Sequence, residues 1–169
     1  MPSHILVAYG SKNGSTREIA GWIVDALNSA GCEAVAEPAA DVRTPAPYDA
    51  VVLGGALYAG CWHRDTARFA RRHTPVLRDR PVWLFSSGPL DSSASEREIP
   101  PVRQVRRMAE RLGARGHITF GGKLDADAEG WMARRIVAAG QGGDHRDPDS
   151  VASWATGIAR ELRRTSLTS

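Results

Sequence analysis

The stretch HILVAYGSKNGSTREI, from His4 to Ile19, decides how the rest of the chain is interpreted. It begins with an apolar run, Ile5 to Ala8, which is typical of a strand buried on both faces. At Gly10 the run gives way to a turn of small and hydroxyl-bearing residues. Apolar residues then recur at helical spacing, namely Ile19, Trp22, Ile23, Ala26 and Leu27. The stretch therefore predicts a strand, a polar turn and a helix N-terminus in immediate succession.

The polar turn has the composition of an anion-binding site. The first amides of a helix lack internal partners and carry the positive end of the helix dipole. Gly14 allows a ligand to approach the backbone, and the hydroxyls of Ser11, Ser15 and Thr16 can donate hydrogen bonds. A P-loop is excluded because Lys12 precedes Gly14, and the dinucleotide fingerprint G-x-G-x-x-G is missing. The turn favours a metal-free site for a terminal monophosphate. The alternative is a polar turn whose Ser or Thr merely caps the helix.

The composition of the chain is that of one globular domain. Its 169 residues are 42% hydrophobic and 24% charged, which predicts a single domain over residues 1–169. No apolar stretch approaches the length of a membrane span, and the N-terminus lacks the regions of a signal peptide, so we expect a cytoplasmic protein. The two cysteines, Cys32 and Cys61, form no disulfide framework. No Cys/His spacing resembles a zinc site, and we expect no bound metal.

The net charge of +3 rests mostly on arginines that cluster on predicted helices. One interpretation is a set of solvated helical faces. The other is an affinity for acidic proteins, carboxylated small molecules or a lipid surface. Nucleic acid is not an expected partner, because the chain has no helix-turn-helix pattern, RNA-binding motif or aromatic-rich basic surface.

Beyond residue 30 the predicted strands alternate with predicted helices. We expect strands at 32–37, 48–54, 81–86 and 117–124, helices at 64–73, 102–112 and 148–164, and a helical patch at 131–139. The prolines of residues 38–47 indicate a loop. The order predicts an α/β fold with a doubly wound, five-stranded parallel sheet, helices on both faces and the second strand at an edge.

Three loops with many small residues leave the carboxyl ends of these strands, at 10–16, 54–63 and 86–91. In open α/β sheets the ligand binds at those ends, near the point where the strand order reverses. We expect the first loop to hold the phosphate tail of a planar ligand and the other two loops to flank its ring.

At this point the chain resembles the flavodoxin family. The phosphate loop of that family, [S/T]-x-[S/T]-G-x-[S/T], is matched by residues 11–16 except at Asn13, where a hydroxyl is usual. Other segments resemble the branch related to menaquinone-dependent protoporphyrinogen dehydrogenase: 55–60 with Trp62, 69–73, 81–89, 121–125 and 143–147. That branch carries an extra segment, here about 126–146.

The resemblance implies noncovalent FMN as the cofactor. It assigns the phosphate to the loop side chains and amides of Ser11, Lys12, Asn13, Gly14, Ser15 and Thr16. It assigns one face of the flavin ring to Ala56, Leu57, Tyr58, Ala59, Gly60 and Trp62, with Tyr58 or Trp62 as the stacking residue. It assigns the pyrimidine edge to Ser86, Ser87, Gly88, Pro89 and Asp91, a loop without an aromatic residue, so that one ring face is expected to be open.

The chain has a positive net charge, and His63 and Arg64 directly follow the loop expected to flank the ring. A positive neighbour stabilises an anionic reduced flavin, so this charge favours two-electron chemistry over one-electron transfer. We expect an FMN oxidoreductase with a quinone-type acceptor, porphyrinogen as a candidate substrate and His63 as a candidate proton relay. The alternatives are a one-electron carrier flavodoxin with a redox partner protein, and a deazaflavin-binding module. In segment 126–146 an apolar stripe could meet a quinone or membrane surface, or pack on the sheet: Trp131, Met132, Ile136 and Val137. A homodimer also stays open.

Overall fold

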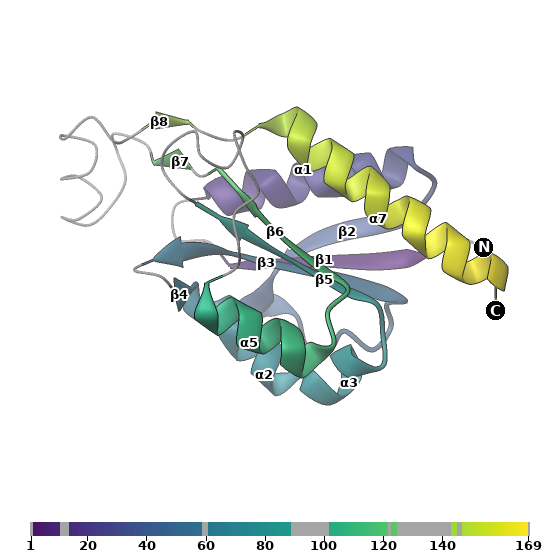
Figure 1. The fold of residues 1–169 in the computed structure, drawn as a ribbon, viewed down its shortest axis with the longest axis horizontal. Helices are drawn as coiled ribbons and strands as arrows, with labels where there is room; N and C mark the ends of the chain where they lie inside the picture. The colour runs from purple at the N-terminus through teal and green to yellow at the C-terminus, as the bar shows by residue number, and fades with distance from the viewer. Residues whose placement is uncertain are drawn as a thin grey trace.

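The computed structural model of the chain has a central parallel β-sheet between two layers of helices (Figure 1). It describes residues 2–10, 14–58, 61–88, 102–121, 123–124, 143–144 and 147–168. The parallel strands are β1 (His4–Gly10), β2 (Glu33–Pro38), β3 (Ala50–Tyr58), β5 (Val82–Ser87) and β6 (Gly116–Phe120). Their order across the sheet is β2-β1-β3-β5-β6, with β2 at one edge. The predicted five-stranded parallel sheet is confirmed, and so is the edge position of the second strand.

The described residues also form two short antiparallel pairings, of which one extends the main sheet. Strand β4 (Cys61–Trp62) folds back on the end of β3 and pairs Leu57 with Trp62. Strands β7 (Lys123–Leu124) and β8 (Gly143–Asp144) pair with each other and form a separate two-stranded sheet.

The helices cover both faces of the sheet, as a doubly wound fold requires. Figure 1 shows α1 (Ser15–Ser29) and α7 (Pro148–Thr168) on one face. On the other face lie α2 (Arg64–Arg72), α3 (Thr74–Arg78) and α5 (Arg103–Leu112). A single 3₁₀ turn, η1 (Ala39–Asp41), follows β2.

Each face of the sheet has its own hydrophobic core, because successive side chains of a strand point to opposite faces. Strand β1 shows the alternation: Ile5 and Val7 join the core under α1 and α7, and Leu6 joins the core under α2 and α5. All three side chains are fully buried. The continuous apolar run predicted for this strand is thus explained by burial on both sides.

Glycines in β3 allow neighbouring side chains to cross the strand closely. A Cβ at Gly54 would collide with the ring of Phe85 on β5. A Cβ at Gly55 would lie 2.6 Å from the hydroxyl oxygen of Thr66 on α2. Both positions therefore need a residue without a side chain, and both lie near the carboxyl end of the strand.

The structure differs from the sequence-based expectations at several boundaries. Strand β3 continues to Tyr58 instead of ending at Gly54, because its last residues pair with β4. The strand expected at 117–124 ends at Phe120, and a new helix, α3, begins at Thr74 after α2. The helical patch expected at 131–139 lies outside the described residues, as does segment 126–146 apart from Gly143 and Asp144. In the described part of the chain no helix is both long enough and apolar enough to cross a bilayer.

Candidate functional site

The carboxyl ends of four parallel strands meet at one edge of the sheet. The register pairs Gly10 of β1 with Gly55 of β3, Gly55 with Ser86 of β5, and Ser86 with Thr119 of β6. The sequence-predicted loops that begin at residues 10, 54 and 86 therefore start side by side. The chain passes from β1 to β2 on one side of β1 and then crosses to β3 on the other side. The carboxyl ends of β1 and β3 therefore flank the point where the strand order reverses.

The helix that follows β1 begins at Gly14, which has φ 82° and ψ −10° and stands at the N-cap of α1. This left-handed conformation favours glycine. Glycine has no side chain, so the N-cap residue makes no side-chain capping hydrogen bond to the first turn. The alternative in which Ser or Thr serves as the helix N-cap does not describe this turn, because the N-cap residue is Gly14.

Thr16 has a buried hydroxyl without a hydrogen-bond partner among the described residues. Its side chain is fully buried in the first turn of α1, and Oγ1 has no hydrogen-bond partner among the described residues. An unsatisfied buried hydroxyl costs about 1–3 kcal/mol, so such groups are rare and call for an explanation. A ligand oxygen bound at this turn supplies one. Ser15 is buried beside it, whereas Ser11, Lys12 and Asn13 lie outside the described residues.

The hairpin of β3 and β4 places Trp62 in the core and not on the surface of the site. The indole is 3% exposed and packs in the core under α2 and α5. Its Nε1 donates a hydrogen bond of 3.3 Å to the carbonyl of Phe85, and its backbone N–H donates one of 2.7 Å to Oε1 of Gln104 on α5. A ring that stacks on a ligand must offer a face to it, and the ring of Trp62 is enclosed by protein. Of the two aromatic candidates, this leaves Tyr58, at the end of β3, for stacking.

The remaining residues predicted in this loop are placed as follows. Ala56 is buried and Leu57 is half-buried near the end of β3. Ala59 and Gly60 lie outside the described residues.

His63 starts helix α2. Its Nδ1 accepts a hydrogen bond of 3.1 Å from the backbone N–H of Asp65 and caps the helix. A Cβ added at Gly10 would lie 2.9 Å from the same nitrogen, so the imidazole lies directly against the end of β1. The Nδ1 lone pair that accepts this bond is the one that a second proton would need. A ring that caps α2 through Nδ1 can donate a hydrogen bond only through Nε2.

The third loop begins with Ser86 and Ser87, which are 1% and 5% exposed, and continues through the buried Gly88. The N–H of Gly88 donates a hydrogen bond of 2.8 Å to the carbonyl of Phe120 and fixes the start of the loop on β6. Pro89 and Asp91 lie outside the described residues.

Sequence reasoning missed His117, which lies beside Ser86. Nε2 of His117 is 3.1 Å from Oγ of Ser86, and burial lowers the pKa of His117 from 6.5 to about 4, so the ring is neutral at neutral pH. The pair shares a sheet face because Ser86 is in register with Thr119, two residues beyond His117. The alternation of side chains along β6 could have indicated which face His117 points to. To place it beside Ser86, however, the register of the two strands was needed, and the two residues are 31 positions apart.

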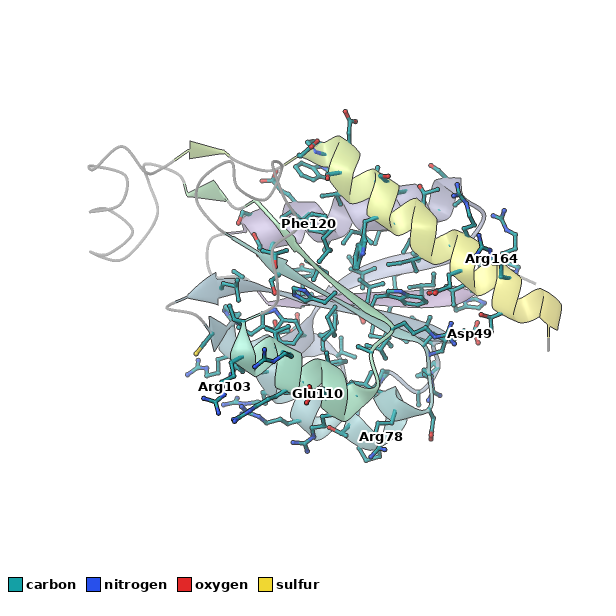
Figure 2. All side chains as sticks on the ribbon, viewed as in Figure 1. Asp49, Arg78, Arg103, Glu110, Phe120 and Arg164 are labelled. Atoms are coloured by element: carbon teal, nitrogen blue, oxygen red, sulfur yellow. The ribbon has the colours of Figure 1, made fainter. Side chains whose placement is uncertain are left out.

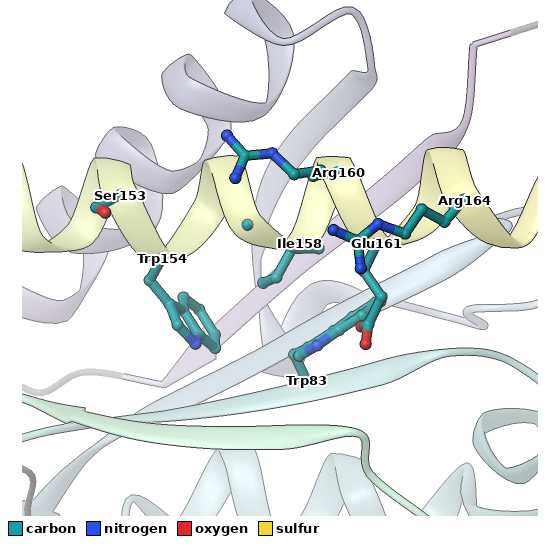
Figure 3. A pocket seen from close by; sticks show the side chains of 8 residues that line it. Trp83, Ser153, Trp154, Ile158, Arg160, Glu161 and Arg164 are labelled. Atoms are coloured by element: carbon teal, nitrogen blue, oxygen red, sulfur yellow. The ribbon is translucent and has the colours of Figure 1, made fainter.

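A second feature, far from this edge, is a hollow of about 410 Å³ between α7 and β5 (Figure 3). Trp154 lines it from α7 and Trp83 from β5, and in this view Glu161 extends from α7 toward Trp83 whereas Arg160 extends away from it. Trp83 is three residues before Ser86 on β5 and pairs with Gly116 at the start of β6. The hollow therefore lies toward the amino ends of the strands and is not the candidate cofactor site.

The described residues of the sheet edge fit the phosphate end of FMN. Two features of this edge suit a phosphate group: the buried hydroxyl of Thr16, which has no hydrogen-bond partner among the described residues, and the glycine N-cap of α1. Within the described residues no group of three or more His, Cys, Asp or Glu is placed to hold a metal ion.

Comparison with known proteins gives this geometry a family context. The flavodoxin domain family model matches residues 6–150. The protoporphyrinogen IX dehydrogenase [quinone] of Escherichia coli strain K12 is 28% identical over 104 residues, which cover 60% of this chain and 57% of that protein. The chain thus matches little more than half the length of this curated relative.

Solved structures support the same fold. An archaeal flavodoxin superposes with a TM-score of 0.63 and 13% identity, covering 95% of this chain and 99% of that one. The rubredoxin oxygen:oxidoreductase of Desulfovibrio gigas superposes with a TM-score of 0.66 and 12% identity, covering 96% of this chain and 37% of that one. At such low identity these likenesses establish the fold alone, and they agree with the flavodoxin-like sheet described above.

Proposed function

Because the chain belongs to the flavodoxin domain family, whose model matches residues 6–150, we propose that it is an FMN-dependent oxidoreductase. FMN is the cofactor that this family implies, in agreement with the expectation from the sequence. The proposed reaction takes two electrons and two protons from a reduced donor and adds them to a quinone-type acceptor, which becomes the quinol. Bound FMN supplies the two-electron redox centre for this exchange.

The observation that carries the proposal is the hydroxyl of Thr16. It is fully buried at the first turn of α1 and has no partner among the described residues. In the proposed complex it donates to a phosphate oxygen, together with the hydroxyl of Ser15 and the amides at the start of the helix. The side chains of Ser11 and Asn13 and the amide of Lys12 complete this phosphate site.

The ring of the cofactor is proposed to lie across the ends of β3 and β5. Tyr58 stacks on one face, and Ala56, Leu57, Ala59 and Gly60 flank it. The loop from Ser86 to Asp91 would hold the pyrimidine edge through its backbone amides, apart from that of Gly88, which donates to the carbonyl of Phe120. The third loop, residues 86–91, has no aromatic residue to cover the other face of the ring, which is left open for the substrate.

The substrate class is proposed from the relative and from the charge of the chain. The relative from Escherichia coli is a protoporphyrinogen IX dehydrogenase that uses a quinone, so a porphyrinogen is the proposed donor and a quinone the proposed acceptor. Guanidinium groups pair with carboxylates such as those of a porphyrinogen. His63 is proposed as the proton relay, acting through Nε2 because Nδ1 caps α2.

The proposal is tested by purifying the protein, identifying its cofactor and following turnover with a porphyrinogen as donor and menadione as acceptor. We expect a yellow protein that releases FMN on heating, reduces one quinone per two electrons and loses most of its FMN when Thr16 is replaced by Val. A protein that binds a deazaflavin instead, or one that passes only single electrons and never reduces menadione, would overturn the proposal.

A further inference from the structure

The arginines of the chain gather on the face of the sheet that carries α2, α3 and α5. These three helices contain nine arginines and only two carboxylates, Asp65 and Glu110, which gives them a net charge of +7. The whole chain has a net charge of +3, so the rest of it carries −4. Figure 2 shows Arg103 and Glu110 on α5 and Arg78 on α3, all on this side of the molecule. The molecule is therefore strongly polarised.

Part of this face is hollowed next to the candidate cofactor site. A groove of about 490 Å³ is lined by Cys61, Arg71, Arg103, Gln104, Arg107, Met108 and Arg111. The four arginines and Cys61 are exposed. Cys61 belongs to β4, the strand that closes the hairpin after Tyr58, so the groove ends at the loop proposed to flank the flavin ring.

The groove arginines form a stripe because of helical spacing. Arg103, Arg107 and Arg111 recur every four residues on α5, which spreads their side chains over about 12 Å of one helix face. The opposite face of α5 is buried in the core through Val105, Met108 and Leu112. Arg71 faces the same groove from α2.

The charges of the stripe do not stabilise helix α5, although Nε of Arg111 donates a hydrogen bond of 3.1 Å to Oγ1 of Thr74 on α3. Like charges four residues apart on a helix destabilise it by about 0.2–0.5 kcal/mol for each pair. Arg103 also stands at the first position of α5, where the first turn has no acidic residue and the helix dipole disfavours a cation. In the part of the chain that the structure describes, none of the four groove arginines forms an ion pair with a carboxylate. The arrangement thus holds positive charge without an internal counterpart.

We propose that this groove and the surrounding helices are the docking surface for an acidic protein, which meets the chain beside the flavin-flanking hairpin. This inference rests on the proposed function, because it takes the docked protein to be a partner of that same cofactor site. Arginine and methionine are enriched in protein interfaces, and complementary charge speeds association. A small-molecule site would be enclosed, with few polar groups, whereas here exposed arginines spread over three helices.

The test measures binding of a carboxylate-rich ferredoxin, used as a probe, to the protein with its cofactor bound. We expect binding at low ionic strength that weakens strongly near 0.5 M salt, since the screening length falls to a few ångströms at about that concentration. The double variant Arg103→Gln/Arg107→Gln should raise Kd about tenfold or more, because interface arginines are frequent hot spots.

The matched control is Arg160→Gln/Arg164→Gln on α7, which removes the same charge from the opposite side of the sheet. It should change Kd by less than about twofold if the effect is local, because added salt screens distant charges. Far-ultraviolet circular dichroism checks that both exposed double variants keep the fold.

Equal weakening by both variants would overturn the inference, because binding would then follow net charge alone. The absence of ferredoxin binding at low salt would also overturn it. The same holds if the groove binds only a porphyrin dicarboxylate or only anionic phosphatidylglycerol vesicles. Binding is measured without turnover. Failure to dock with quinone reduction intact would therefore overturn this inference alone, whereas a protein without FMN would overturn the proposed function.

Discussion

The hydroxyl of Thr66 donates a hydrogen bond of 3.0 Å to the carbonyl of Gly54 and ties the first turn of α2 to β3. Both groups are buried. The same hydroxyl occupies the space that a Cβ would need at Gly10 and at Gly55. One side chain therefore explains why the adjoining ends of β1 and β3 are glycines. Thr66 belongs to α2, whereas Thr16 belongs to α1 on the opposite face of the sheet. Thr16 is also buried, but its hydroxyl has no hydrogen-bond partner among the described residues.

These two threonines give a matched pair of substitutions. Thr16→Val removes a buried hydroxyl that makes no hydrogen bond in the described structure, so the cofactor-free protein should keep its free energy of unfolding or gain up to about 1 kcal/mol. FMN affinity should fall by about tenfold to a hundredfold, because a hydrogen bond to a charged phosphate is lost. Urea denaturation of the cofactor-free protein and fluorescence titration with FMN measure the two quantities.

Thr66→Val should behave in the opposite way. It leaves the carbonyl of Gly54 without its side-chain donor and should lower the free energy of unfolding of the cofactor-free protein by about 1–2 kcal/mol. A Thr16→Val protein that unfolds as easily as Thr66→Val would contradict the assignment of Thr16 to the ligand.

Gly55→Ala should destabilise the fold at the site edge. Its Cβ would lie 2.6 Å from Oγ1 of Thr66 and 3.2 Å from the indole of Trp62, and both neighbours are buried. Overpacking of this kind costs about 1–3 kcal/mol. Gly21→Ala is the control, because a Cβ there meets nothing within 4 Å and lies inside α1. It should stabilise the protein by about 0.5–1 kcal/mol. Thermal and urea unfolding distinguish the two, and equal effects would refute the steric argument.

His117 should make stability depend on pH. Burial lowers its pKa from 6.5 to about 4. Above pH 6.5 the ring is neutral in both the folded and the unfolded chain, so the free energy of unfolding there is not reduced by this group. As the pH falls below 6.5, the unfolded chain takes up a proton that the folded chain does not, and stability declines until the pH reaches about 4. The loss should be about 1–2 kcal/mol, less than the full linkage value because the ring stays partly exposed to water.

The measurement is the urea midpoint at several pH values between 4 and 7. His117→Gln should flatten the decline. A smaller slope should persist from His73, whose pKa is lowered by burial and by the nearby Arg72. An unchanged decline in His117→Gln would assign the pH dependence elsewhere.

Two aromatic substitutions separate packing from stacking. Trp62→Phe removes the N–H that donates to the carbonyl of Phe85, so it should cost about 1–2 kcal/mol of stability and leave the flavin absorption spectrum unchanged. Tyr58→Leu should shift the flavin spectrum and weaken FMN binding, because a stacked aromatic pair contributes about 0.5–1.5 kcal/mol. A spectral change in Trp62→Phe alone would place the stacking residue at Trp62.

The order of strands and helices was predictable because each element carries its own periodicity and the connections obey simple rules. The buried run of β1, the edge position of β2 and the convergence of three loops at the carboxyl edge were all deduced in this way. Strand β3 was predicted to end at Gly54, because glycines weaken a strand and the residues that follow are small. The strand continues because Gly55 and Ala56 pair with β5, and Leu57 and Tyr58 pair with β4.

The details of the site could not be predicted, because they depend on contacts between residues far apart in the chain. Trp62 was predicted as a candidate stacking residue, and only its contacts with Phe85 and Gln104 show that it packs in the core. The contact between Ser86 and His117 needed the register of β5 and β6. The unpaired hydroxyl of Thr16 is a property of three-dimensional burial and leaves no trace in residue spacing.

The bond from the backbone N–H of Trp62 to Gln104 has a thermodynamic consequence. It joins the β3–β4 hairpin, proposed to cover the flavin, to α5, which carries the arginine stripe. A movement of the hairpin therefore displaces α5, and a movement of α5 displaces the hairpin. Any change in FMN affinity that docking causes must then be matched by an equal change in docking affinity when FMN binds. Gln104→Leu should uncouple the two equilibria while each site still binds its own ligand.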